Sequence, residues 1–217
     1  MIACGLAKPQ ADGWLFGEKA VTVIAYHLIW TNYGTWLPND PRGSGSKVAY
    51  TSVIAELGDV HLGRKKLQPA RSKVREFYKS AEPLLRFPVI RFDAEQRSVI
   101  AEGFGDTIRT HQYTCYACAI MPDHVHLVIR KHKHDAEAMI DNLQDESRAL
   151  LIERGIVLDE HPVWTKGGWK VFLDTPEEVW PRIRYVESNP MKEGLPKQVW
   201  PFVVPYDNWP FHKRQRS

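Results

Sequence analysis

The chain contains few cysteines and no long apolar segment. Its 217 residues include three cysteines, and this low, odd number argues against a disulfide framework and for a reducing compartment. No run of 18 apolar residues occurs, so we expect no membrane-spanning helix and no membrane partner. The first residues lack the basic region and apolar run of a secretory signal. Together these absences predict a cytoplasmic globular protein.

Charge of one sign is not in large excess either. The net charge of +3 does not by itself indicate a nucleic-acid partner. The basic residues are nevertheless clustered, in segments 64–79, 130–134 and 212–216. Such clusters can neutralise phosphates or can be solvated faces, and charge alone does not decide between the two. The eight tryptophans are expected mostly in the core, although some can stack on unpaired bases.

Hydrophobic periodicity and turn residues divide the chain into strands and helices. Runs rich in β-branched residues predict strands, and apolar stripes preceded by capping residues predict helices. In chain order we expect a strand at 20–31, a helix at 93–111, strands at 112–120 and 124–130, a helix at 135–154, a strand at 169–173 and a helix at 175–189. This order predicts an α+β protein with a ferredoxin-like βαββαβ sheet, helices on one face, and an appended C-terminal helix.

The remaining segments fit around a single domain of residues 1–217. Residues 44–90 are polar, basic and weakly periodic, so we interpret them as an insertion with one or two short helices, one of them near 72–78. Residues 191–217 are rich in proline and tryptophan, and we expect them to form an irregular C-terminal tail.

A pair of histidines is the first candidate site. The residues from 119 to 129 read as a strand, a tight Pro-Asp turn and a second strand that carries His124 and His126. Because side chains alternate along a strand, both imidazoles project from the same side. Two imidazoles on one face can each donate a nitrogen to one divalent metal. A His-x-His pair can also be purely structural, so the pattern is a hypothesis of a metal site.

The late helix supplies a second set of candidates. Tyr185 and Asn189 are four residues apart and share one helix face, with Arg182 a turn earlier. A phenol can attack phosphorus, an amide oxygen can complete a metal shell, and a guanidinium can hold a phosphate. These residues also have a structural reading, in which Tyr185 is an interfacial aromatic and Asn189 ends the helix before a proline. Pro181 lies inside the same helix and is expected to kink it or to delay its start.

These motifs resemble a known family. The segment MPDHVH at 121–126, followed by YVESNP at 185–190, resembles the HUH single-tyrosine transposases, and most closely the REP-associated tyrosine transposases and their insertion-sequence relatives. The loop YGTWLP at 33–38, with DPRG at 40–43, is also similar to members of this group. The resemblance covers roughly residues 20–43 and 93–200, and it leaves out the insertion and both termini.

The resemblance implies metal-dependent cleavage and rejoining of single-stranded DNA, as in DNA transposition. His124 and His126 would bind Mg²⁺ or Mn²⁺, with Asn189 as a third ligand, and Tyr185 would form a 5′-phosphotyrosine link to DNA. The implied partner is hairpin-forming single-stranded DNA, and the chain would act as a monomer or as a homodimer. Residues that could contact DNA, on their charge, aromatic character or place in the motifs, are Arg182, Arg130, Lys131, Arg42, Tyr33 and Trp36.

Other readings remain open from the sequence. Cys115 and Cys118, followed by His124 and His126, offer four soft ligands for zinc, although two cysteines three apart on a strand face opposite ways. A nucleic-acid-binding module without catalysis would keep the basic clusters and the fold. A replication-initiator or relaxase nuclease would share the chemistry but lack the tyrosine, asparagine and proline context.

Overall fold

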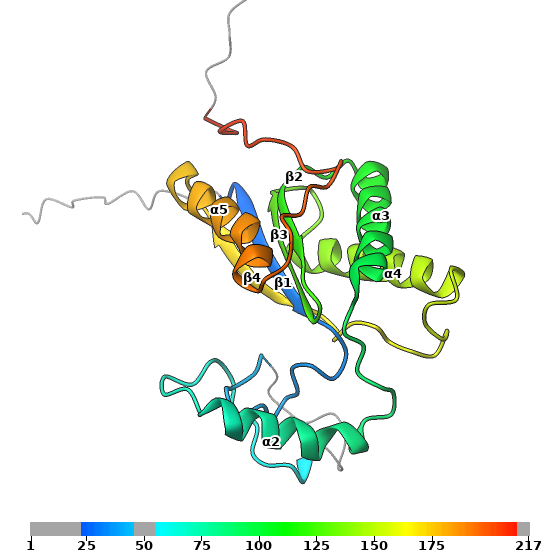
Figure 1. The fold of residues 1–217 in the computed structure, drawn as a ribbon. Coiled ribbons are helices and arrows are strands. Elements are labelled where there is room, and N and C mark those ends of the chain that lie inside the picture. Colours follow the sequence, from blue (N-terminus) through cyan, green and yellow to red (C-terminus); the bar gives the residue numbers. More distant parts are fainter. Residues whose placement is uncertain (1–22, 46–54, 212–217) are drawn as a thin grey trace, which may run out of the picture.

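The computed structural model describes residues 23–45 and 55–211 (Figure 1). Strand β1 (Ala25–Thr31) is followed by helices α2 (Arg71–Ala81), η1 (Glu82–Leu84) and α3 (Ala94–His111). Strands β2 (Cys115–Ile120) and β3 (His124–Arg130), helix α4 (Ala136–Glu153), strand β4 (Trp169–Leu173) and helix α5 (Pro176–Lys192) complete the order. The predicted α+β class is confirmed, because these strands form one antiparallel sheet with helices around it.

The strand order in the sheet is β2-β3-β1-β4, so β1 and β3 lie in the middle. Ile29 of β1 lies opposite His126 of β3, and His27 lies opposite Val128. Residues directly opposite in an antiparallel pair project from the same face. The register therefore places His27 and His126 on one face of the sheet, although they are 99 residues apart in the chain.

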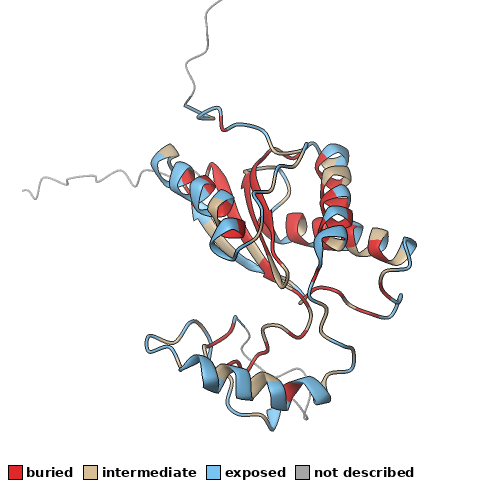
Figure 2. Cartoon of the chain, in the orientation of Figure 1, coloured by how far each residue is buried: buried red, intermediate tan, exposed pale blue. Residues whose placement is uncertain are grey.

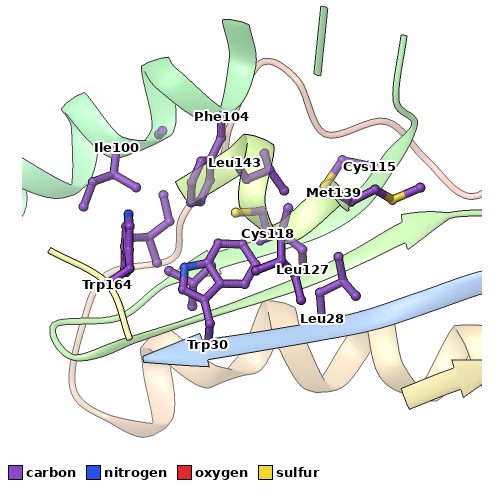
Figure 3. Packing of buried hydrophobic residues seen from close by; sticks show 14 of the residues in the cluster. Leu28, Trp30, Ile100, Phe104, Cys115, Cys118, Leu127, Met139, Leu143 and Trp164 are labelled. Atoms are coloured by element: carbon purple, nitrogen blue, oxygen red, sulfur yellow. The ribbon is translucent and has the colours of Figure 1, made fainter. Parts of the chain in front are cut away.

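The two faces of the sheet bury different helices. On one face, Leu28, Trp30 and Leu127 pack with Phe104 of α3 and Leu143 of α4 (Figure 3). On the other, a second apolar cluster joins β1, β2 and β3 to α5; it includes Ala25, Ala119, Val128, Val179, Ile183 and Val186. The predicted pair of helices thus shares a face, and the appended helix covers the opposite one. Figure 2 shows most of the residues of the central strands coloured as buried.

Capping residues set the helix starts. Asp93 and Gln96 form a complete capping box at α3, and the Asp135 side chain accepts from the Ala138 N–H at α4, so both predicted starts are confirmed. The predicted end of the last helix is wrong: α5 continues past Asn189 to Lys192 and contains both Pro181 and Pro190. Each of these prolines removes a single backbone donor, and packing of the buried helix face can offset that loss.

The first strand is shorter than predicted. It begins at Ala25, and the predicted residues 20–22 lie outside the described part of the chain. The predicted insertion carries α2, whose described neighbours form a small cluster around Leu37 and Ala81, apart from the sheet in Figure 1. Residues 46–54 of the insertion are also outside the described ranges.

The segment after α5 runs along β2. The Gln198 amide donates to the Ile120 carbonyl at 2.7 Å and accepts from the Ile120 N–H at 2.8 Å, and Val203 bridges to Cys115. This segment therefore occupies the outer edge of β2, part of the region predicted to be an irregular tail. In the described ranges no helix is both long and apolar enough to span a bilayer.

Candidate active site

The two predicted metal-binding histidines lie side by side on β3. The ring centroids of His124 and His126 are 4.9 Å apart, and the rings are nearly perpendicular. His126 is buried, whereas His124 is partly exposed at the start of the strand. The pair therefore presents one imidazole to the interior and one to the surface, on the face that α5 covers.

A third histidine, which the sequence reasoning missed, contacts this pair. The Nε2 atom of His27 lies 3.0 Å from Nδ1 of His126, in a buried hydrogen bond. Burial lowers the pKa of His27 to about 4, helped by the nearby charge of Arg182, and lowers that of His126 to about 2, helped by the two neighbouring histidines. Both rings are thus neutral at pH 7, the form in which an imidazole can ligate a metal.

The hydrogen bonds also indicate which nitrogens are free. The Asp123 carboxylate can only accept, so His124 donates its Nδ1–H to Asp123 Oδ1 at 2.7 Å and leaves its Nε2 lone pair available. This hydrogen bond is the largest cause of the lowered pKa of Asp123. His126 uses its Nδ1 with His27, and in the tautomer in which His126 donates this hydrogen bond its Nε2 lone pair is left for a ligand. Such outer partners are typical of metal-binding histidines.

The turn that carries Asp123 is anchored by the loop after β1. The amide of Asn32, which is fully buried, donates to the carbonyls of Pro122 at 3.0 Å and Ile90 at 2.8 Å. The Thr35 hydroxyl donates to the Asp123 carbonyl at 3.3 Å, and Arg91 pairs with the Asp123 carboxylate at 3.0 Å. The loop thus fixes the carboxylate that orients His124.

Tyr185 of α5 lies over the histidines of its own chain. Its ring centroid is 5.6 Å from that of His126 and 6.0 Å from that of His27. The side chain is 42% exposed, so the phenol borders solvent and the histidine face at once. The Lys192 ammonium lies 5.0 Å from the Tyr185 ring centroid. The Tyr185 phenol and the imidazoles of His126 and His27 therefore lie together within one chain.

Two other predicted residues of α5 flank this tyrosine. Asn189 is 8% exposed and belongs to the buried side of the helix, and its amide makes no side-chain hydrogen bond with any described residue. Arg182 lines an open cavity of about 410 Å³ together with Tyr185, Pro181 and Phe172. This cavity borders the phenol and contains the guanidinium that was predicted to hold a phosphate.

The remaining predicted DNA-contacting residues lie elsewhere. Arg130 and Lys131 line a separate cavity at the far end of β3. In the loop after β1, the guanidinium of Arg42 pairs with Asp40 and lies 4.0 Å from the ring centroid of Trp36, whose indole N–H donates to the Gly43 carbonyl. The Tyr33 hydroxyl accepts from the Arg86 N–H, and its ring packs on Phe87 and His161. Arg42 and Trp36 thus make contacts within their own loop, whereas Tyr33 connects the loop to the segment before α3 and to His161.

The zinc alternative is wrong on geometry. The two cysteines do not face opposite ways as expected, because a register irregularity between Cys115 and Ala117 places both in the apolar cluster under α3 and α4, with Cys118 opposite Leu127 (Figure 3). His126 projects from the other face. Burial raises the pKa of the Cys115 thiol to about 12 and that of Cys118 well above its usual value. Across the described residues, no group of three or more His, Cys, Asp or Glu side chains is placed to hold a metal.

One feature of the sequence indicates that His27 faces the candidate site. His27 is the one ionisable imidazole in a strand rich in apolar and aromatic residues, with the opposite parity to the core residues Tyr26, Leu28 and Trp30. Its partner, however, depends on the register between β1 and β3. Asp123 belonged to the quoted motif but was not assigned a role.

Comparisons with known proteins find similar solved structures. No family model and no curated protein matches the chain. A REP-associated tyrosine transposase bound to a REP hairpin matches with a TM-score of 0.44 and 13% identity, over 82% of this chain and 74% of that one. A protein of Deinococcus radiodurans R1, described as a candidate transposase, matches with a TM-score of 0.32 and 14% identity, over 84% of this chain and 97% of that one.

Proposed function

We propose that this chain cleaves and rejoins single-stranded DNA, as in transposition, with Tyr185 as the nucleophile. The observation that carries the proposal is the position of the phenol, whose ring lies 5.6 Å from that of His126 in the same chain. A tyrosine this exposed, beside neutral imidazoles and an arginine, suits attack on a phosphodiester. The motif pattern quoted above points to the same chemistry independently of these distances.

The donor set fits a divalent cation, for which we propose Mg²⁺ or Mn²⁺. His124 and His126 each have one ring nitrogen engaged with an outer partner and Nε2 left for the metal. We assign Asn189 as the third ligand because its amide has no side-chain hydrogen bond among the described residues and lies one turn after Tyr185. A bound cation would polarise a phosphoryl oxygen and orient the phosphate for in-line attack.

The chain's own residues carry the covalent step. The phenol oxygen of Tyr185 bonds to phosphorus as it loses its proton. The bond from phosphorus to the 3′ oxygen breaks, and that oxygen gains a proton to become a free 3′-hydroxyl. Arg182, in the cavity beside Tyr185, would hold a phosphate oxygen through its guanidinium. The reverse reaction rejoins the strand without an external energy source, because the phosphotyrosine link keeps the phosphodiester bond energy.

A covalent adduct tests the proposal. A hairpin-forming single strand labelled at its 3′ end, incubated with protein and Mn²⁺, should give a labelled protein band on a denaturing gel. The same strand labelled at its 5′ end should give a shortened free fragment instead. Tyr185→Phe should abolish both products. Tyr116→Phe is the matched control, because Tyr116 is buried and its hydroxyl contacts Asp207 at 3.4 Å. An adduct that survives Tyr185→Phe would refute the assignment.

The same assay addresses the non-catalytic reading. A protein that binds the strand, retains bound Mn²⁺ and yet forms no adduct would be a binding module. The partly exposed phenol beside the histidines favours the enzyme, since a binding module has no need of that juxtaposition.

A further inference from the structure

A basic groove lies at the opposite end of β3 from His124. It has a volume of about 440 Å³ and opens to solvent, and it is lined by Arg130, Lys131, His132 and Lys133 together with Gln112, Thr114 and Trp209. None of the described residues that line this groove is acidic. We call it the β3-end groove.

The three cations of the groove have no carboxylate partner among the described residues. The guanidinium of Arg130 instead lies 3.8 Å from the centroid of the Trp209 indole, in a cation–π contact. Lys131 and Lys133 are exposed and form no ion pair with a described residue. The Asp207 carboxylate lies near Trp209, but no ion pair among the described residues joins it to these cations, and three like charges gathered along one groove attract an anion, most strongly a polyanion.

The backbone of the groove is fixed by the sheet. The Arg130 N–H donates to the Thr114 carbonyl at 2.9 Å, and the Lys131 N–H donates to the Ile24 carbonyl at 2.9 Å. These hydrogen bonds fix the backbone of Arg130 and Lys131 at the edge of the sheet. A binding surface built on a strand end is more rigid than one built on a free loop.

The histidine of the groove offers a donor rather than a metal ligand. The His134 N–H donates to Nδ1 of His132 at 3.2 Å, so a neutral His132 carries its proton on Nε2. An N–H donor suits a phosphate oxygen. A neutral His134 would also carry its proton on Nε2. The Tyr113 hydroxyl accepts from the Asn142 amide at 2.9 Å, and its own proton can then be donated to His134 Nδ1 at 2.7 Å.

The groove also aligns with the candidate active site. His126 and Arg130 are four residues apart on one strand, so their side chains share a face and their Cα atoms are separated by roughly 13 Å. A flexible DNA strand held at Tyr185 can reach this position with a neighbouring phosphate. Val128, between them, is buried under α5, so a DNA strand that joins the two sites would pass outside the helix rather than along the face of the sheet.

We propose that the β3-end groove binds a backbone phosphate of the single-stranded DNA, at a distance from the phosphate that is cleaved. Arg130, Lys131 and Lys133 supply the charge, and Trp209 holds the guanidinium of Arg130 in place. This inference rests on the proposed function, since it assigns a second contact to the same strand.

A salt titration of DNA binding tests this groove. Fluorescence anisotropy with a labelled single strand, in a Tyr185→Phe background that blocks cleavage, gives affinity as a function of salt concentration. Lys131→Gln with Lys133→Gln should weaken binding and lower the slope of log affinity against log salt by about 1.4, which is roughly 0.7 for each lost phosphate contact. Both lysines are exposed, so the folded structure should not change.

The control removes the same charge from the other face of the sheet. Arg109 and Arg154 belong to α3 and to the end of α4, and their pairs with Asp106 and Glu102 are exposed. Arg109→Gln with Arg154→Gln should leave the slope unchanged. If the two double variants give equal slopes while Tyr185→Phe still binds DNA, the groove assignment is wrong and the proposed function stands. If Tyr185→Phe binds no strand at any salt concentration and the unsubstituted chain forms no adduct, both fail.

Discussion

The contact between His27 and His126 makes a prediction about metal affinity. For Nε2 of His126 to bind a cation, its Nδ1–H must donate to Nε2 of His27, 3.0 Å away. His27→Phe removes this acceptor and leaves a buried donor without a partner, because His126 is only 6% exposed. An unsatisfied buried donor costs about 1–3 kcal/mol. Because Nδ1 of His27 is itself buried without a hydrogen-bond partner among the described residues, the variant also removes one unsatisfied group, so we expect a loss of Mn²⁺ affinity at the lower end of this range, roughly 5-fold.

Isothermal titration of Mn²⁺ measures this loss directly and does not depend on DNA. His27→Gln is the matched control, because a glutamine carbonyl can accept the same proton, and it should retain most of the affinity. A ¹⁵N spectrum of the ring nitrogens, recorded with diamagnetic Mg²⁺, should show the proton of His126 on Nδ1 in the bound state. Equal affinities for His27→Phe and the unsubstituted chain would refute the reasoning, and so would a proton on Nε2.

Two further predictions concern stability. In metal-free buffer the free energy of unfolding should fall as pH drops from about 6.5 towards 4. In the folded chain the pKa of His27 is lowered to about 4 and that of His126 to about 2. Over this pH range the unfolded chain therefore binds more protons than the folded chain, and acid favours unfolding. Urea unfolding at several pH values should show a shallower fall for His27→Gln, and an unchanged slope would contradict the buried, neutral pair. Gly103→Ala should destabilise the fold by about 1–3 kcal/mol, since its Cβ would meet the α4 backbone at 2.8 Å. Gly105→Ala, in the same helix but with its nearest contact at 3.4 Å from a side chain, should be neutral or stabilising in thermal unfolding, and similar melting temperatures for the two variants would refute the close helix packing.

The elements with local signals could be predicted from the sequence. Asp93 and Asp135 indicate helix starts because each side chain can accept from a backbone N–H three residues later, and the structure contains both of these hydrogen bonds. The parity of His124 and His126 likewise follows from one strand alone. The predicted end of α5 is wrong because it rests on a local rule, that a residue before proline avoids the helical conformation. The burial of Val186 and Asn189 is a tertiary effect that the local sequence does not show, and the helix continues past Pro190.

The features that depend on register or on distant segments could not be predicted. Gln198 satisfies both backbone groups of Ile120 from 78 residues away, and nothing in the tail's composition indicates that pairing. The DNA-contacting role expected for Arg42 and Trp36 came from charge and aromatic character, yet the buried carboxylate of Asp40 beside them gives that arginine an internal partner. Charge patterns locate cations, and only the fold shows which cations are already paired.

The candidate site depends on elements that are distant in the sequence, so substitutions outside the site can disrupt it. His27, His126 and Tyr185 come from β1, β3 and α5, and their contacts require the β1–β3 register and the packing of α5 on the same face. A shift of β1 by one residue would turn His27 into the α3 and α4 core and would leave His126 without its partner. The loop that begins at Asn32 opposes such a shift, because its buried amide bonds to the carbonyl of Pro122 in the turn before His124. Weakening that anchor should therefore lower metal affinity from outside the site, through the position of Asp123 and His124.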